Sequence, residues 1–175
     1  MRIAAHVFLA YVLVLCLGAV WRLLPLRPVP DVVALIAVYL GLTARGQVAP
    51  STLGAVISGY LADLLFGTPR GLLALTAGVL CLIGHLVHQR LLVRGRLFTI
   101  GFSFFTGLVA GLVILAIRLG ADRVRGGLGS ELYVLLGSAL LTGLAGPVVF
   151  RICRLVDARF ARTRRDRDVT VGGAL

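Results

Sequence analysis

The feature that most constrains this chain is a series of six apolar stretches, which take up most of its 175 residues. A helix needs roughly 20 apolar residues to cross the ~30 Å hydrocarbon core of a bilayer. Five of the stretches approach that length and one is shorter. The predicted helices are 3–20, 32–43, 48–66, 72–87, 97–117 and 132–150. The sequence therefore predicts an all-α integral membrane protein, a bundle of six transmembrane helices.

The composition excludes a water-soluble globular fold. Hydrophobic residues make up 59% of the chain and charged residues 14%, with a mean hydropathy of +1.01. Soluble domains have roughly 45–50% apolar and about 25% charged residues. Cys16, Cys81 and Cys153 lie in or beside apolar stretches, so we expect them to be packing residues rather than a disulfide framework.

The second stretch, 32–43, is too short to cross a bilayer unaided. Its 12 residues would extend only ~18 Å as a helix. Asp31 is expected to cap the N-terminus of this helix, because its side chain can accept a hydrogen bond from an early backbone amide. The helix must be shielded by its neighbours or thin the bilayer locally. A five-span protein with a re-entrant second segment is the alternative.

The charge of the chain indicates its orientation in the membrane. The net charge is +11, from 18 arginines and 7 acidic residues. A basic soluble protein would suggest nucleic-acid binding, but here the charge lies in short linkers and the C-terminal segment, so no nucleic-acid partner is expected. Six spans with a cytoplasmic N-terminus put 12 arginines inside and 6 outside. The positive-inside rule therefore predicts that both termini are cytoplasmic.

The chain is expected to divide into a six-helix transmembrane domain, 1–157, and a basic cytoplasmic tail, 158–175. The segment 151–168 contains seven arginines and three aspartates, and its first half has an apolar side. We expect this segment to continue the sixth helix along the cytoplasmic surface, where each basic group near anionic lipid contributes ~1 kcal/mol. Membrane lipid is favoured over a specific cytoplasmic protein as the partner of this tail.

Small residues recur every four positions along the predicted helices, and such rows let helices approach closely in lipid. The residues that define a helix-packing groove are Gly54 and Ser58 in the helix 48–66, and Gly107 and Gly111 in the helix 97–117. The groove either builds the monomer bundle or receives a transmembrane helix of a partner.

Asp63 is the only acidic residue well inside a predicted span. A carboxylate in hydrocarbon is costly, so it must face protein or water. The dipole at the C-terminal end of the helix 48–66 repels an anion and does not explain its presence. Its partner is expected to be the Thr68 hydroxyl, a turn amide, Arg70 or a group of another protein. Asp63 therefore either holds its own turn or shapes an interaction site at the outer surface.

Few groups in the chain could support catalysis or bind a metal. His85 and His88 are spaced i, i+3, but no acid or cysteine is placed in sequence to complete a metal site. The chain also lacks a phosphate-binding glycine loop with lysine, a nucleophile–base pair and paired membrane carboxylates. We therefore expect a non-enzyme with no metal and no cofactor.

The residues around Asp63 resemble those of a known family. The string Asp-Leu-Leu-x-Gly-Thr-Pro-x-Gly begins at Asp63, and Pro30-Asp31-Val32-Val33 begins the short second helix. With the length, the number of spans and the basic C-terminal end, this pattern resembles MreD, the rod shape-determining membrane protein of bacteria. The resemblance implies a structural or partner-binding motif made of Gly59, Asp63, Gly67, Thr68, Pro69 and Gly71.

The resemblance also implies location, partners and fold. MreD proteins lie in the cytoplasmic (inner) membrane and belong to the machinery that inserts peptidoglycan along the side wall. Their partner is MreC, a single-span protein, and both are linked to the MreB cytoskeleton, the RodA glycosyltransferase and its penicillin-binding transpeptidase. The fold of the family resembles the S component of energy-coupling vitamin transporters. The expected function is a non-enzymatic scaffold that holds the MreC helix in the small-residue groove and helps to control rod shape.

Two other classes stay open. A substrate-binding subunit of a vitamin-type transporter would need a polar-lined pocket near the outer face. The residues that could contribute to it are Asp63, Thr99, Ser103, Thr106 and Thr142. A lipid-modifying membrane enzyme would need acid and base groups that are missing from the sequence.

Overall fold

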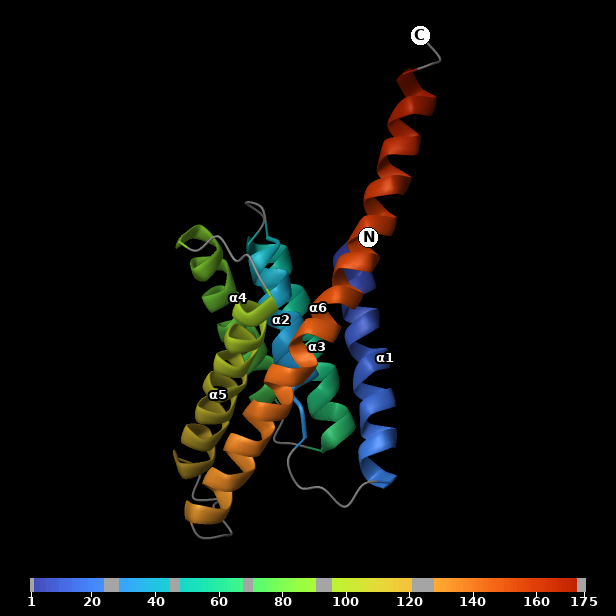
Figure 1. Cartoon of the computed structure of the whole chain (residues 1–175). Coiled ribbons are helices and arrows are strands. Elements are labelled where there is room, and N and C mark those ends of the chain that lie inside the picture. The colour runs from blue at the N-terminus through green and yellow to red at the C-terminus, as the bar shows by residue number, and fades with distance from the viewer. Residues whose placement is uncertain are drawn as a thin grey trace.

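The computed structural model describes residues 2–23, 29–44, 48–67, 71–90, 96–120 and 128–172. Six α-helices make up nearly all of these ranges, which contain no β-strand. The helices are α1 (Arg2–Leu23), α2 (Val32–Leu42), α3 (Val48–Phe66), α4 (Leu72–Arg90), α5 (Arg96–Gly120) and α6 (Leu128–Gly172). The prediction of an all-α protein is confirmed. Successive helices run in opposite directions, so the start of α1 and the C-terminal end of α6 lie at one end of the molecule (Figure 1).

Four of the described helices are long and apolar enough to cross a membrane. Their apolar windows are Ile3–Val20 in α1, Val48–Phe66 in α3, Thr99–Ala116 in α5 and Glu131–Arg159 in α6. The apolar segments of α2 and α4, Val32–Leu42 and Leu72–Val87, are shorter. These lengths and compositions are those of an integral membrane protein.

The short helix α2 lies at the centre of the bundle. Every residue from Val32 to Gly41 is buried, and α2 packs against all five other helices. A helix covered on all sides needs no polar face, which explains why its sequence is continuously apolar. The prediction that the short second helix would be shielded by its neighbours is confirmed.

The start of α2 is tied to the middle of α6. The backbone N–H of Ala34 donates to the Asp31 carboxylate at 2.9 Å, so the predicted N-cap is confirmed. The N–H of Asp31 donates to the Thr142 hydroxyl at 2.9 Å, and the Ser138 hydroxyl donates to the carbonyl of Val29 at 2.7 Å. The bonds from Asp31 and Ala34 satisfy part-buried backbone N–H groups, and the exposed bond from Ser138 adds a second link between this segment and α6.

Glycines set the closest contacts between helices. A Cβ on Gly84 of α4 would lie 2.7 Å from the carbonyl oxygen of Val38 on α2, and a Cβ on Gly41 would overlap the carbonyl oxygen of Cys81. The backbones of α2 and α4 therefore touch directly. Neither Gly41 nor Gly84 belongs to the predicted groove, so this backbone contact between α2 and α4 was not predicted from the sequence.

The helix α6 is much longer than the predicted span. It continues as one helix through Pro147 and past residue 157, where the tail was expected to begin. Figure 1 shows the C-terminal half of α6 leaving the bundle in the general direction of the helix, rather than folding along the end of the bundle. The expectation that the sixth helix continues into the tail is confirmed, and its course along the cytoplasmic surface stays a prediction.

Candidate functional site

The Asp63 carboxylate links the end of α3 to the start of α4. Its side chain is 2% exposed. It accepts hydrogen bonds from the N–H of Gly71 at 3.0 Å, from the N–H of Leu73 at 3.1 Å and from the N–H of Ala74 at 3.3 Å. Asp63 therefore acts as a cap for a helix to which it does not belong.

This arrangement explains how a carboxylate is stable inside an apolar protein. The first amides of a helix have no intrahelical acceptor, and the helix dipole favours an anion at that end. The helix dipole that stabilises the Asp63 carboxylate is that of α4, not that of α3, to which Asp63 belongs. The expectation that Asp63 holds its own turn is confirmed, with turn and helix amides as the partners. The other candidates, Thr68 and Arg70, lie outside the described residues.

Gly59 lets α3 and α4 come close enough for this cap to form. It lies one turn before Asp63 on the same face of α3, and both residues meet the first turn of α4. A Cβ on Gly59 would lie 2.5 Å from the carbonyl oxygen of Leu73 and 2.7 Å from the Cα of Ala74. Because these are backbone atoms, they cannot move aside as a flexible side chain would. Gly59 and Asp63 thus form one structural unit with the start of α4.

Two more residues of the motif are glycines for a conformational reason. Gly67, just after α3, has φ +63°, and Gly71, just before α4, has φ +92°. Among the described residues, chain neighbours apart, no atom lies within 4 Å of a Cβ built on either residue. L-residues with a side chain disfavour positive φ, and glycine does not. Thr68 and Pro69 lie between them, outside the described residues.

The predicted groove residues are covered by helices of the same chain. A Cβ on Gly54 would lie 2.5 Å from the Ile3 side chain on α1, and the Ser58 hydroxyl donates to the Gly54 carbonyl at 2.6 Å. Gly107 faces Ala139 and Thr142 on α6, and Gly111 faces Leu135 on the same helix. The distances from a Cβ are 3.0 Å to the Ala139 Cα and 2.8 Å to the Leu135 Cγ. These four residues build the monomer bundle.

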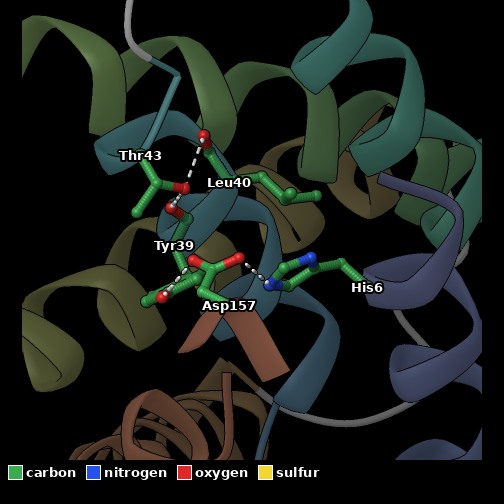
Figure 2. Close-up of polar contacts among 5 residues, drawn as sticks. All are labelled: His6, Tyr39, Leu40, Thr43 and Asp157. Atoms are coloured by element: carbon green, nitrogen blue, oxygen red, sulfur yellow. Dashed lines mark hydrogen bonds and ion pairs between the residues drawn. The ribbon is translucent and has the colours of Figure 1, made fainter. Parts of the chain in front are cut away.

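A second polar cluster joins α1, α2 and α6 at the opposite end of the bundle (Figure 2). The Tyr39 hydroxyl donates to the Asp157 carboxylate at 2.8 Å, and the His6 Nε2 lies 3.5 Å from the other carboxylate oxygen. The rings of His6 and Tyr39 stack with centroids 5.6 Å apart. The Thr43 hydroxyl donates to the Tyr39 carbonyl at 2.8 Å and closes the end of α2. The cluster sets where α6 leaves the bundle.

This cluster was not predicted from the sequence. His6 is fully buried, but nothing in its surroundings within α1 distinguishes it, and Asp157 was counted only as one acid of a basic segment. One signal was available, because Phe150, Cys153 and Asp157 have i, i+3, i+7 spacing, which puts them on one face of a helix. Phe150 and Cys153 are buried, so this face continues the inner side of α6 as far as Asp157.

The hydroxyl residues considered for a ligand pocket are buried in the bundle, and two of them bond to its backbone. Thr106 donates to the carbonyl of Phe102 at 2.9 Å, and Thr142 donates to the carbonyl of Ser138 at 2.7 Å while accepting from Asp31. Thr99 and Ser103 are buried between helices. Asp63 already accepts three amide hydrogen bonds. Thr106, Thr142 and Asp63 therefore bond within the bundle, whereas the buried Ser103 hydroxyl has no hydrogen-bond partner among the described residues.

The described part of the chain holds no group of three His, Cys, Asp or Glu side chains arranged to bind a metal ion. His85 lies on α4, and the side chain of His88 is outside the described residues. Comparison of the chain with protein-family models, with curated proteins and with solved structures found no match.

Proposed function

We propose that this protein is a non-enzymatic membrane scaffold of the MreD type, which binds MreC and helps to control side-wall peptidoglycan synthesis and rod shape. The observation that carries the proposal is the turn from Asp63 to Gly71. Its sequence resembles the family string, and each described residue of the motif has a physical role in joining α3 to α4. Asp63 caps α4, Gly67 and Gly71 have positive φ, and Gly59 permits the close approach.

The proposed setting is the bacterial cytoplasmic membrane, with six spans, an S-component-like arrangement and both termini inside. Support comes from the arginine distribution and from the position of the N-terminal end of α1 beside the projecting part of α6 (Figure 1). Reporter fusions test this topology. A fusion after residue 175 is expected to read as cytoplasmic, and an extracytoplasmic reading would contradict the proposed orientation.

The surface proposed for MreC is an exposed apolar face rather than the small-residue groove. Gly54, Ser58, Gly107 and Gly111 are covered within the monomer, so a partner helix would have to lie elsewhere. Each long helix has exposed apolar side chains that could receive it, and MreB, RodA and the transpeptidase would join through the assembled complex. One exposed representative on each of five helices is Phe8, Tyr60, Leu82, Phe105 and Leu144.

Co-purification with MreC after detergent extraction is the direct test. At matched expression, we expect a near-stoichiometric complex, and its absence would count against the proposal. A photocrosslinking residue placed in turn at the five exposed positions would then show the docking face. We expect crosslinks to MreC from one or two neighbouring helices, with the remaining positions as matched controls facing lipid.

The transporter alternative is not favoured by the site geometry. A vitamin site requires polar groups that are free to face a ligand. Thr106, Thr142 and Asp63 instead bond within the bundle. A vitamin that co-purifies with the protein from native membranes would reverse this preference.

A further inference from the structure

The imidazole of His6 on α1 is a fully buried titratable group that lies against a carboxylate of α6. Its side chain is 0% exposed, and its Nε2 lies 3.5 Å from Oδ1 of Asp157 (Figure 2). Histidine is the side chain whose charge changes between pH 5 and 8 in most settings. The strength of this contact between two helices therefore depends on whether His6 is neutral or protonated.

The Asp157 carboxylate is oriented by a second group as well. The Tyr39 hydroxyl donates to Oδ2 at 2.8 Å, so Oδ1 is left facing His6. The Tyr39 ring also stacks on the His6 ring, with centroids 5.6 Å apart. A hydrogen bond donated to an ionised carboxylate favours the ionised form. A counter-ion for a protonated His6 is therefore already in place beside it.

The helices α2 and α3 bring no further titratable group to this end of α1. α1 packs against α2, α3 and α6, and Tyr39 is the titratable residue of α2. α3 meets this end of α1 at Gly54. The titratable residues of α3 are Tyr60 and Asp63, which lie further along that helix toward its opposite end.

The remaining charged or titratable neighbours on α1 and α6 do not change their charge in this pH range. Cys153 and Arg154 lie about one turn before the carboxylate on α6, and Arg159 follows it. Arg2 lies about one turn before the histidine on α1, and its side chain is outside the described residues. Arginine stays protonated in proteins, and a thiol buried in apolar surroundings stays neutral. A change of charge at this contact between pH 8 and pH 6 is therefore a change at the histidine.

We propose that His6 and Asp157 form a proton-sensitive clamp between α1 and α6. Protonation of His6 turns the 3.5 Å contact into a charge-assisted hydrogen bond, which draws the two helices together, and loss of the proton weakens it. Asp157 is 22% exposed, so protons reach the pair from this end of the bundle. The clamp sets how firmly α6 is held where it leaves the bundle. It does not depend on the MreC partnership, so the two proposals can fail separately.

Nuclear magnetic resonance of the full-length protein in detergent, with 13C-labelled histidine, tests the clamp. The signal that is missing from His6→Gln belongs to His6, and we expect this signal to shift between pH 8 and pH 5 in the wild type. Asp157→Asn keeps the size of the side chain and removes its charge. In that variant the midpoint of the shift is expected to fall by about one pH unit. A His6 signal that stays constant over this range, or an unchanged midpoint in Asp157→Asn, would overturn the proposal.

Thermal unfolding adds a readout that a purely structural contact would not change. The contact binds a proton that the unfolded chain binds less tightly, so it should stabilise the fold more at pH 6 than at pH 8. The fall in Tm caused by His6→Gln is therefore expected to be larger at pH 6, because glutamine takes up no proton. Asp157→Asn should lose Tm on acidification relative to the wild type, because a charged imidazole would be buried without its counter-ion. Equal losses at both pH values in His6→Gln would contradict the clamp.

His85→Gln is the matched control for these measurements. It removes a different histidine, on α4, which does not pack against α1. We expect this variant to keep the pH dependence of the wild type. If His85→Gln abolished the pH dependence, the assignment of the proton site to His6 would be wrong.

Discussion

The two ends of the bundle each hold a carboxylate, and they satisfy it in different ways. Asp63 is 2% exposed and accepts backbone amides from residues that follow it by 8 to 11 positions. Asp157 is 22% exposed and meets two side chains, one of them 118 positions away. Backbone donors belong to the helix itself, whereas Tyr39 and His6 are individually replaceable. A side-chain substitution can therefore remove a partner of Asp157, whereas the backbone amides that bond to Asp63 are present whatever the side chains are.

The largest effect that this comparison predicts is for Asp63→Ala. Three amides, one buried and two part-buried, would lose their acceptor, so we expect the free energy of unfolding to fall by about 3 kcal/mol. Unfolding of the purified protein in detergent measures it. Asp63→Asn keeps one acceptor oxygen and should lose less. If Asp63→Ala were as stable as the wild type, the hydrogen bonds of Asp63 would not contribute more to stability than those of Asp157.

Gly59→Val should be the next most damaging change at this end. The added atoms meet the backbone of Leu73 and Ala74, so we expect a loss of about 2 kcal/mol in the same unfolding measurement. Gly101→Ala is the matched control, because Gly101 is exposed on α5 with no atom within 4 Å of a Cβ. That control should be neutral or slightly stabilising. Equal losses in both variants would show that helix contact is not the cause.

Gly67→Ala measures the cost of placing a residue with a side chain at the positive φ of this turn. A Cβ meets no atom of the described residues there, chain neighbours apart, so the expected loss of about 1 kcal/mol comes from φ +63°. Gly67→Asn should lose less, since asparagine tolerates this region better than alanine does. If the two variants were equally stable, positive φ would not be the reason for glycine at this position.

Tyr39→Phe should have the smallest effect, about 0.5 kcal/mol, because Asp157 is partly exposed and water can replace the lost hydroxyl. A double-mutant cycle with Asp157→Asn measures the coupling between the two residues. We expect the combined loss to be smaller than the sum of the single losses. Strict additivity would mean that the 2.8 Å contact contributes nothing to stability.

Glycine contacts show a limit of reading a sequence by its periodicity. The rows on the helices 48–66 and 97–117 were found because small residues recur there every four positions. Gly84 is flanked at that spacing by Leu80 and His88, so no row identifies it. Its importance comes from the backbone of α2, which lies against α4. Which helix faces which glycine depends on packing between distant segments, and a single helix does not contain that information.

The amino-acid sequence by itself determined the helical class, the number of helices, the short central helix and its Asp31 cap. These features depend on the length of apolar runs and on hydrogen bonds between residues three positions apart. Only the tertiary structure decided that α4 supplies the amides for Asp63, and that His6, Tyr39 and Asp157 meet. Buried polar groups take whichever partner the neighbouring helix presents, and the choice of neighbour is made by the packing of the whole bundle.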